Sequence, residues 1–341
     1  MNSPKRILFS GNDPGGAHAV APVVRALAVR GDMIIGYAAG PAVGVFSRYG
    51  LACTDADAMT EKELFGAVDA STPDVFLSGT SGGRTIDKKI LLHLKGLVPS
   101  VYVLDFWHNY RQRFSDTEGG VAYFPTAVCV MDNLARKEML EAGIPETPIR
   151  ITGNPYFEHF AEGITRADED KNIVLFISQP VSEMSRVHGA AQYGFDEYSV
   201  LKSIIGVLPA PLQLSIRLHP REDPRKYDAF LNERVRISAE STLEESLSRA
   251  GLVVSMFSPV LLQAAVAGKN VLSYQPGLTG KDPLPTNALG ITKRAGSEEE
   301  LRTFLTAYER GENLGIVRGI QDFLAKDATE RVIAVIDALR T

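Results

Sequence analysis

Residues 7–18 have the sequence ILFSGNDPGGAH, and this stretch indicates the fold. Its first four residues, Ile7 to Ser10, form a short apolar run of the kind found in buried parallel strands. A loop with three glycines follows, and apolar residues then recur with helical spacing from Ala19 to Val29. The sequence therefore predicts a strand, a glycine-rich loop and a helix, which is the repeating unit of an α/β fold.

The same alternation continues along the chain. Sequences of the Thr/Ser-x-x-Glu type, which cap helix starts, occur at Thr60, Thr242 and Ser297, and a last helix is expected over residues 328–339. Further short apolar runs of strand length lie at 33–38, 74–78, 100–104, 127–130, 149–152, 173–177, 212–218, 251–255 and 270–274.

The length of 341 residues exceeds what one hydrophobic core usually supports, so two domains are expected. The polar, acidic stretch from His159 to Lys171 is the predicted linker. We expect two Rossmann-like, doubly wound domains facing a central cleft, over residues 1–160 and 170–341, with a last helix that can cross back to the first domain. In such folds ligands bind at the carboxyl ends of the strands.

Composition narrows the class of protein. The net charge of −5 gives no global basic field for nucleic acid, so no nucleic-acid partner is expected. No apolar run is long enough for a signal peptide or a membrane span, so we expect a cytoplasmic protein with at most peripheral membrane contact. Cys53 and Cys129 form no C-x-x-C pair, and no metal site is predicted.

The loop after the first strand is a candidate ligand site. Gly11, Gly15 and Gly16 let a ligand approach the backbone, Asp13 is a candidate general base, and His18 is a candidate substrate ligand or cap. The loop lacks the G-x-G-x-x-G and Gly-Lys-Ser/Thr patterns, so neither NAD nor ATP is expected, and no cofactor is predicted. A glycine-rich connection without a ligand is the alternative interpretation.

The segment 104–114, LDFWHNYRQRF, places acidic, imidazole and guanidinium groups directly after the strand predicted at 100–104. Asp105 and His108 are further candidate bases, and Trp107 could stack on a sugar or a nucleobase. In the alternative interpretation the aromatic pair closes the edge of the core and the two arginines pair with surface acids.

The segment Arg217–Arg221, RLHPR, ends a strand of the second half. Because Pro220 stops the strand, His219 and Arg221 are expected at the carboxyl edge of the sheet, where they could clamp a phosphate, with Arg217 also a candidate. A surface turn with solvated charges is the alternative.

Two further segments carry polar side chains to the same edge. Ser255 and Ser258 lie between a strand and a helix and could hold phosphate oxygens, unless they act only as helix caps. Gln263, further along that helix, could contact a ribose or face solvent. Gln179, after the strand at 173–177, could bind a base or a phosphate.

These elements in this order resemble the GT-B superfamily of nucleotide-sugar enzymes, which includes glycosyltransferases and UDP-N-acetylglucosamine 2-epimerases. TGNP at 152–155, which contains Asn154, is similar to the sequence that closes the first domain in epimerases and several transferases. SPVLLQAAVAGKNVLSY at 258–274 is similar to the diphosphate and ribose segment. His219-Pro220 with the later serines resembles motifs of bacterial sialyltransferase-like and phosphotransferase families that use CMP- or CDP-linked donors.

The resemblance implies a glycosyltransferase that moves a sugar from a CMP- or UDP-linked donor to a glycan or protein acceptor in bacterial surface glycan assembly. It implies an acceptor site in the first domain and a donor site in the second, where His219, Arg221, Ser255 and Ser258 would hold the donor phosphate without a metal ion. Asp13 or Asp105 would deprotonate the acceptor.

Three departures from the family patterns leave alternatives open. The His-Arg-Glu-Asn segment of epimerases is replaced by SQPVSE at 178–183, and Gln263 stands near a position where many members have Glu. The acidic motif that supplies the base in sialyltransferase-like families is matched only in part, at Glu118-Gly119. The alternatives are a nucleotide-sugar 2-epimerase or hydrolase, and a binding protein that has lost catalysis.

Overall fold

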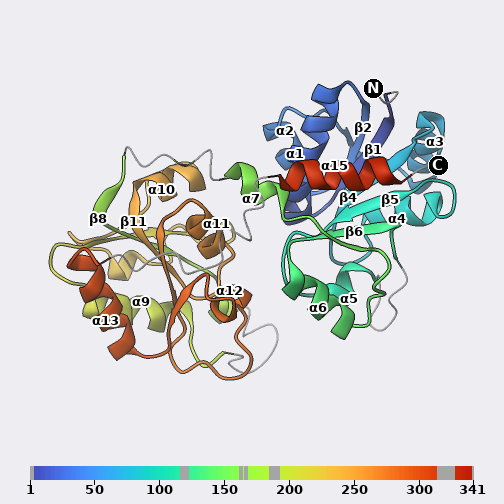
Figure 1. Cartoon of the computed structure of the whole chain (residues 1–341). Coiled ribbons are helices and arrows are strands. Elements are labelled where there is room, and N and C mark those ends of the chain that lie inside the picture. Colours follow the sequence, from blue (N-terminus) through green and yellow to red (C-terminus); the bar gives the residue numbers. More distant parts are fainter. Residues whose placement is uncertain are drawn as a thin grey trace. The chain divides into compact units, whose positions relative to one another are not determined.

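The computed structural model describes residues 4–115, 123–160, 164, 168–183, 193–312 and 327–339. Two compact units are present: unit 1 comprises residues 1–159 and 323–341, and unit 2 comprises residues 160–322. Each unit is built on one all-parallel sheet with helices packed against it (Figure 1). Glu118 and Gly119, and part of the predicted linker, lie outside the described residues.

Unit 1 contains a seven-stranded sheet with the order β3-β2-β1-β4-β5-β6-β7. The order reverses between β1 and β4, and this reversal is the point at which doubly wound sheets bind ligands. The strands are β1 (Arg6–Gly11), β2 (Met33–Ala38), β3 (Thr54–Asp55), β4 (Val75–Gly79), β5 (Ser100–Val103), β6 (Ala127–Val130) and β7 (Ile149–Ile151). The helices are α1 (Pro14–Arg30), α2 (Pro41–Arg48), η1 (Ala56–Ala58), α3 (Glu61–Ser71), α4 (Ile86–Leu94), α5 (Tyr110–Arg113), α6 (Asn133–Glu141), α7 (Pro155–Phe160) and α15 (Ala328–Ala338).

Unit 2 repeats this design with a six-stranded sheet of order β10-β9-β8-β11-β12-β13, reversed between β8 and β11. Its strands are β8 (Asp170–Ile177), β9 (Gln213–Arg217), β10 (Val235–Ile237), β11 (Ala250–Ser255), β12 (Asn270–Tyr274) and β13 (Lys293–Ala295). Its helices are α9 (Glu197–Val207), η3 (Asp228–Phe230), α10 (Leu243–Arg249), α11 (Val260–Val266), α12 (Pro285–Ala288) and α13 (Glu298–Glu309).

Local sequence explains where the helices begin. Helix α1 starts at Pro14, five residues before the predicted start, because proline fits the first helical turn, where its missing N–H is not needed. The capping boxes at Thr60 and Thr242 are confirmed. At Ser297 the hydroxyl caps Glu300 as predicted, but the Glu300 carboxylate accepts from the N–H of Gly296 instead of closing the box.

Helix α15 belongs to unit 1, although it follows all of unit 2 in the sequence. Its buried residues Val332, Ile333 and Ile336 join the apolar cluster formed by β1 and α1, and Figure 1 shows α15 beside α1. Arg30 of α1 pairs with Asp337 of α15, with Nη1 2.7 Å from Oδ2. The chain therefore leaves unit 1, forms unit 2 and returns.

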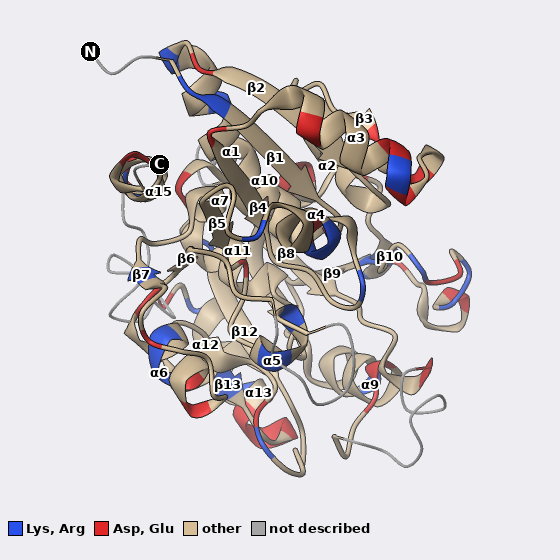
Figure 2. Cartoon of the chain, turned by 90° about the vertical axis from the view of Figure 1, so that its right-hand side faces the viewer, with Lys and Arg blue, Asp and Glu red and all other residues tan. Residues whose placement is uncertain are grey.

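Charged residues lie mainly on the helices and loops that surround each sheet (Figure 2). In Figure 2 the strands are mostly uncharged, while residues of both signs are interspersed on helices and loops. This mixture agrees with the small net charge of −5. In the described part of the chain, no helix combines the length and the apolar character needed to cross a membrane.

Candidate functional site

In unit 1, helix α1 approaches β4 so closely that only glycine fits on both sides of the contact. A Cβ added to Gly79 would lie 2.2 Å from the carbonyl oxygen of Gly16, and one added to Gly16 would lie 2.5 Å from that of Thr80. This contact brings the start of α1 against the segment after β4, at the point where the strand order reverses. Gly16 therefore has a packing function whether or not a ligand is bound.

Asp13 lies at this edge, in the loop between β1 and α1. Its carboxylate accepts hydrogen bonds from the N–H of Gly82 at 3.0 Å and from the side-chain amide of Asn12 at 3.0 Å. Its side chain makes no cap bond to α1. No ion pair joins Asp13 to a cation among the described residues, so its carboxylate is held in place without being neutralised.

Asp105, after β5, has a different environment. Its Oδ1 pairs with the guanidinium of Arg113 and accepts from the hydroxyl of Thr80 at 3.0 Å. A Cβ at Gly15 would lie 2.1 Å from Oδ2, so Gly15 makes room for this carboxylate. One oxygen of Asp105 is thus engaged by an ion pair and a hydroxyl, whereas Asp13 has no ion-pair partner among the described residues.

The aromatic residues after β5 close the edge of the core. Trp107 is only 2% exposed, and its Nε1 donates to Asp132 Oδ2 at 2.9 Å, so its face is not available for a sugar or a nucleobase. His108 is exposed, and its carbonyl accepts from Arg113 Nε at 2.9 Å. The predicted stacking of Trp107 on a ligand is thus wrong, and the packing alternative is confirmed for this residue.

Two other predicted substrate ligands of unit 1 are engaged inside the protein. Gly11 lies against Phe46, whose ring would be 2.8 Å from an added Cβ. Asn154 is buried and donates to the carbonyl of Asp105 at 3.2 Å, while its own side-chain oxygen accepts from the N–H of Tyr156 at 2.9 Å. Asn154 therefore connects the end of β5 to the start of α7.

His18 lies in the second turn of α1, between the ring of Tyr156, 4.7 Å away between centroids, and the hydroxyl of Tyr49, 3.4 Å from Nδ1. Burial, with a further contribution from the charge of Arg48, lowers the pKa of His18 to about 4. The imidazole is consequently neutral near pH 7.

This pKa predicts a pH-dependent loss of stability. The unfolded chain protonates His18 near its ordinary pKa of 6.5, whereas the folded chain does so only near 4. The contribution of neutral His18 is therefore complete above about pH 6.5 and is lost as the pH falls toward 4, at a slope of at most about 1.4 kcal/mol per pH unit. Urea unfolding at about pH 7 and about pH 5 should show a smaller loss for His18→Gln than for the parent; equal losses would contradict the assignment.

In unit 2, Gln179 bridges the point where the strand order reverses between β8 and β11. Its Oε1 accepts from the N–H of Phe257 at 3.0 Å and lies 3.3 Å from Ser255 Oγ. Ser255 is fully buried, and its hydroxyl donates to the carbonyl of Ile177 at 2.7 Å. The N–H of Phe257 thus orients Gln179, and no described residue accepts from the Gln179 amide N–H groups.

The turn after β9 presents His219 and Arg221. The N–H of Arg221 donates to His219 Nδ1 at 3.2 Å, which leaves the proton of the neutral ring on Nε2. Burial is the main cause that lowers the pKa of His219, so the ring is neutral at pH 7. No described residue bonds to Nε2, and the exposed Arg221 side chain has no ion-pair partner among the described residues.

The other residues of unit 2 that were predicted to bind substrate differ in how far their polar groups are already used by bonds within the protein. Arg217 donates from Nη1 to the carbonyl of Glu240 at 3.1 Å and to Ser246 Oγ at 2.8 Å. Ser258 is buried, and its Oγ accepts from the N–H of Val260 at 3.2 Å. Gln263 is half-buried on α11. Of these three, Ser258 keeps a hydroxyl proton that none of its described bonds uses.

Several residues that build these sites were not singled out from the sequence. Thr80 and Gly82 hold the two carboxylates of unit 1, and the glycines in TSGG at 80–83 after an apolar strand were the available signal. Glu222 and Lys226 hold the turn of His219 in unit 2. Their i, i+4 spacing was visible, but spacing does not reveal that both side chains turn inward.

Known structures resemble this chain along its full length, although no protein-family model and no curated protein matches its sequence. A UDP-GlcNAc 2-epimerase from Methanocaldococcus jannaschii superposes with a TM-score of 0.71 at 15% identity, covering 98% of this chain and 100% of that one. The UDP-GlcNAc 2-epimerase from Neisseria meningitidis, bound to UDP-GlcNAc, gives 0.69 at 13% identity, with coverage of 98% and 100%. The glycotransferase of kitacinnamycin gives 0.66 at 15% identity, with full coverage of both chains.

The chain has the GT-B fold. The expected fold class is confirmed. At these identities the similarity shows the fold, and GT-B enzymes of both kinds, epimerases and glycosyltransferases, are among its structural neighbours.

Proposed function

We propose that this GT-B chain is a glycosyltransferase that moves a sugar from a nucleotide-sugar donor to a hydroxyl of a glycan or protein acceptor. In this proposal unit 2 binds the donor and unit 1 supplies the base. Bacterial surface glycan assembly is the proposed setting, and a CMP- or UDP-linked sugar is the proposed donor.

The main support for the proposal is that the Asp13 carboxylate is hydrogen-bonded but has no ion-pair partner among the described residues. Two hydrogen bonds, from Gly82 and Asn12, orient its carboxylate at the reversal point of the unit 1 sheet. A carboxylate that is oriented but not ion-paired can accept the proton of an attacking hydroxyl. Asp105, whose charge Arg113 offsets, would act by positioning the loop around Gly15.

On unit 2, three groups support binding of the leaving phosphate. His219 would donate from Nε2, the exposed Arg221 would supply positive charge, and Ser258 would donate from its hydroxyl. Gln179 would contribute its amide N–H groups, with the N–H of Phe257 holding its carbonyl end. In this proposal no metal is needed, because these groups offset the charge that develops on the leaving nucleotide.

A nucleotide-sugar 2-epimerase or hydrolase is the second candidate, favoured by the similarity to two UDP-GlcNAc 2-epimerases. Proton transfer at the sugar ring needs acid and base groups near the donor. At the end of β8, however, Ser178 and Gln179 stand where epimerases have a charged segment, and both form hydrogen bonds within unit 2. This environment favours transfer over epimerisation.

A ligand screen tests the donor site. Thermal unfolding would be measured with CMP, CDP, UDP, GDP and their sugar conjugates, and we expect one nucleotide class to stabilise the protein by about 2.7 kcal/mol at 100 times its dissociation constant. CMP would support a sialyltransferase-like donor and UDP the wider GT-B class. No response to any nucleotide, or a response only to NAD or ATP, would refute the proposed function.

The stabilising sugar conjugate then separates the candidate activities. A transferase releases the nucleotide much faster when a hydroxyl acceptor is present, whereas an epimerase or hydrolase converts the donor alone. Binding without turnover across a panel of glycan acceptors would instead favour a protein that has kept the fold and lost catalysis.

A further inference from the structure

A buried ionic network lies behind the turn of His219 in unit 2. Lys226 Nζ is 2.6 Å from Glu222 Oε1 and 2.5 Å from Glu197 Oε1. Both carboxylate side chains are fully buried, and the lysine side chain is 4% exposed. Burial alone would lower the pKa of Lys226, but its hydrogen bonds to Glu197 and Glu222 outweigh burial and raise it, so the lysine stays charged.

Glu222 connects this network to the ends of two neighbouring strands. Its Oε2 accepts from the N–H of His219 at 2.7 Å, and its own N–H donates to the carbonyl of His219 at 2.9 Å. Its Oε1 also accepts from the hydroxyl of Ser178, which follows β8, at 2.8 Å. One carboxylate therefore fixes both the turn after β9 and the residue next to Gln179.

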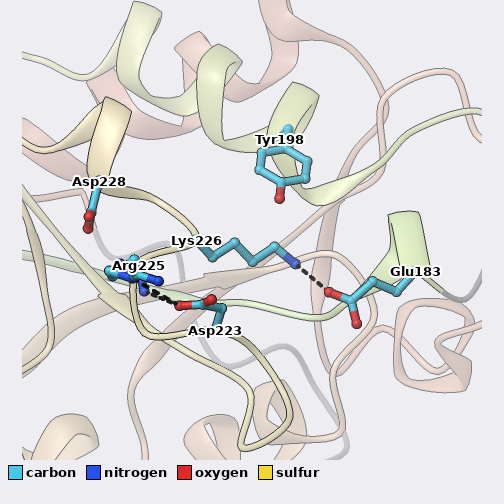
Figure 3. Close-up of a pocket in the computed structure, with 6 residues that line it drawn as sticks. All are labelled: Glu183, Tyr198, Asp223, Arg225, Lys226 and Asp228. Atoms are coloured by element: carbon cyan, nitrogen blue, oxygen red, sulfur yellow. Dashed lines mark hydrogen bonds and ion pairs between the residues drawn. The ribbon is translucent and has the colours of Figure 1, made fainter.

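Lys226 also borders an open pocket of about 500 Å³ (Figure 3). Four of the charged residues on its rim form two pairs, and Asp228 is the fifth: Lys226 lies 3.7 Å from Glu183, and Arg225 lies 3.9 Å from Asp223. Figure 3 shows the lysine extended toward Glu183. Because Lys226 already pairs with Glu183, Glu197 and Glu222, we assign it to the interior network and not to a ligand in this pocket.

We propose that Glu222 is a positioning residue, which sets the His219 turn in the geometry needed to bind the donor phosphate, and that Lys226 holds its carboxylate in place. This assignment rests on the proposed function, in which His219 Nε2 contacts the phosphate. Because the same turn brings the Arg221 N–H to His219 Nδ1, losing the Glu222 carboxylate would loosen both the backbone and the ring.

A double-mutant cycle on nucleotide affinity tests the assignment, with titration calorimetry of the nucleotide that stabilises the parent protein. We expect His219→Ala to weaken affinity about ten- to a hundredfold and Glu222→Gln about tenfold. In the His219→Ala background, Glu222→Gln should change affinity less than twofold, because the glutamate acts through the histidine.

Glu197→Gln is the matched control. Glu197 is the other buried carboxylate that pairs with Lys226, and its remaining bonds go to Ser182, away from His219. It should lower the unfolding temperature as Glu222→Gln does and leave nucleotide affinity unchanged. If Glu222→Gln does not fold, Ser178→Ala removes one hydrogen bond to the same carboxylate, and we expect a two- to fivefold loss of affinity that vanishes without His219.

Three results would overturn the assignment: unchanged affinity in Glu222→Gln, an equal loss of affinity with and without His219, or an equal loss in Glu197→Gln. Each of them leaves the proposed function standing, because the parent protein still binds its nucleotide. Failure of the parent to bind any nucleotide would instead remove the proposed function and this assignment together.

Discussion

Asp13→Asn is expected to reduce turnover of the donor sugar by about 10²- to 10⁴-fold while donor affinity and thermal stability stay close to the parent values. The substitution keeps the size of the side chain and an oxygen that can accept from the N–H of Gly82, but it removes the basic carboxylate. Nucleotide release from the stabilising sugar conjugate, with an acceptor present, would be followed under single-turnover conditions.

Asp57→Asn provides a matched control for this experiment. Asp57 also accepts from a glycine N–H, that of Gly40 at 2.7 Å, but it lies beside β3, away from the reversal point. The same chemical change there should leave turnover unaffected. Full activity in Asp13→Asn would show that the base is another group, and Asp105→Asn, which leaves Arg113 without its partner, would then be the next variant to compare.

Gly79→Ala is expected to have the largest effect on stability. The new Cβ would lie 2.2 to 2.4 Å from the carbonyl oxygen, the carbonyl carbon and the Cα of Gly16, and all three are backbone atoms that no rotamer change can move. Helix α1 would have to shift away from β4, which should cost about 3 kcal/mol of unfolding free energy. Urea denaturation followed by circular dichroism measures the loss.

The control for this variant is Gly66→Ala in the exposed middle of α3. Nothing lies within 4 Å of an added Cβ at that position, so alanine should raise the stability by about 0.5 to 1 kcal/mol through its better helix propensity. A Gly79→Ala protein with the same urea midpoint as the parent would contradict the close contact between α1 and β4.

The sequence predicted the central strands well because they carry continuous apolar runs. Met33–Ala38, Ala127–Val130 and Asn270–Tyr274 occur within the predicted bounds, since such strands are covered on both faces. The three strands that were missed, β3, β10 and β13, all lie at sheet edges. These three strands are short and partly exposed, and sequences such as Thr54-Asp55 carry no apolar signal, whereas the edge strand β7 was predicted from its apolar run.

The sequence predicted which loops form the candidate sites, but it did not predict which side-chain atoms in those loops are free to bind a ligand. The position of Asp13 after the first strand followed from the fold, but its bond to Gly82 joins residues far apart in sequence. Likewise, the sequence places Arg217 inside a predicted strand and Arg221 after it, but it does not show that the Arg217 guanidinium bonds to Glu240 and Ser246 while Arg221 stays exposed. Availability depends on contacts between loops, which periodicity and spacing do not encode.

The return of α15 to unit 1 has a consequence for the order of events during synthesis. A ribosome completes all of unit 2 before it makes Val332, Ile333 and Ile336, which unit 1 needs to cover the surface of α1. Until then the surface of α1 that α15 covers stays exposed on the nascent N-terminal half, while unit 2 is already complete. In this chain, synthesis of unit 1 begins before that of unit 2 and ends after it, so the last packing step takes place in unit 1.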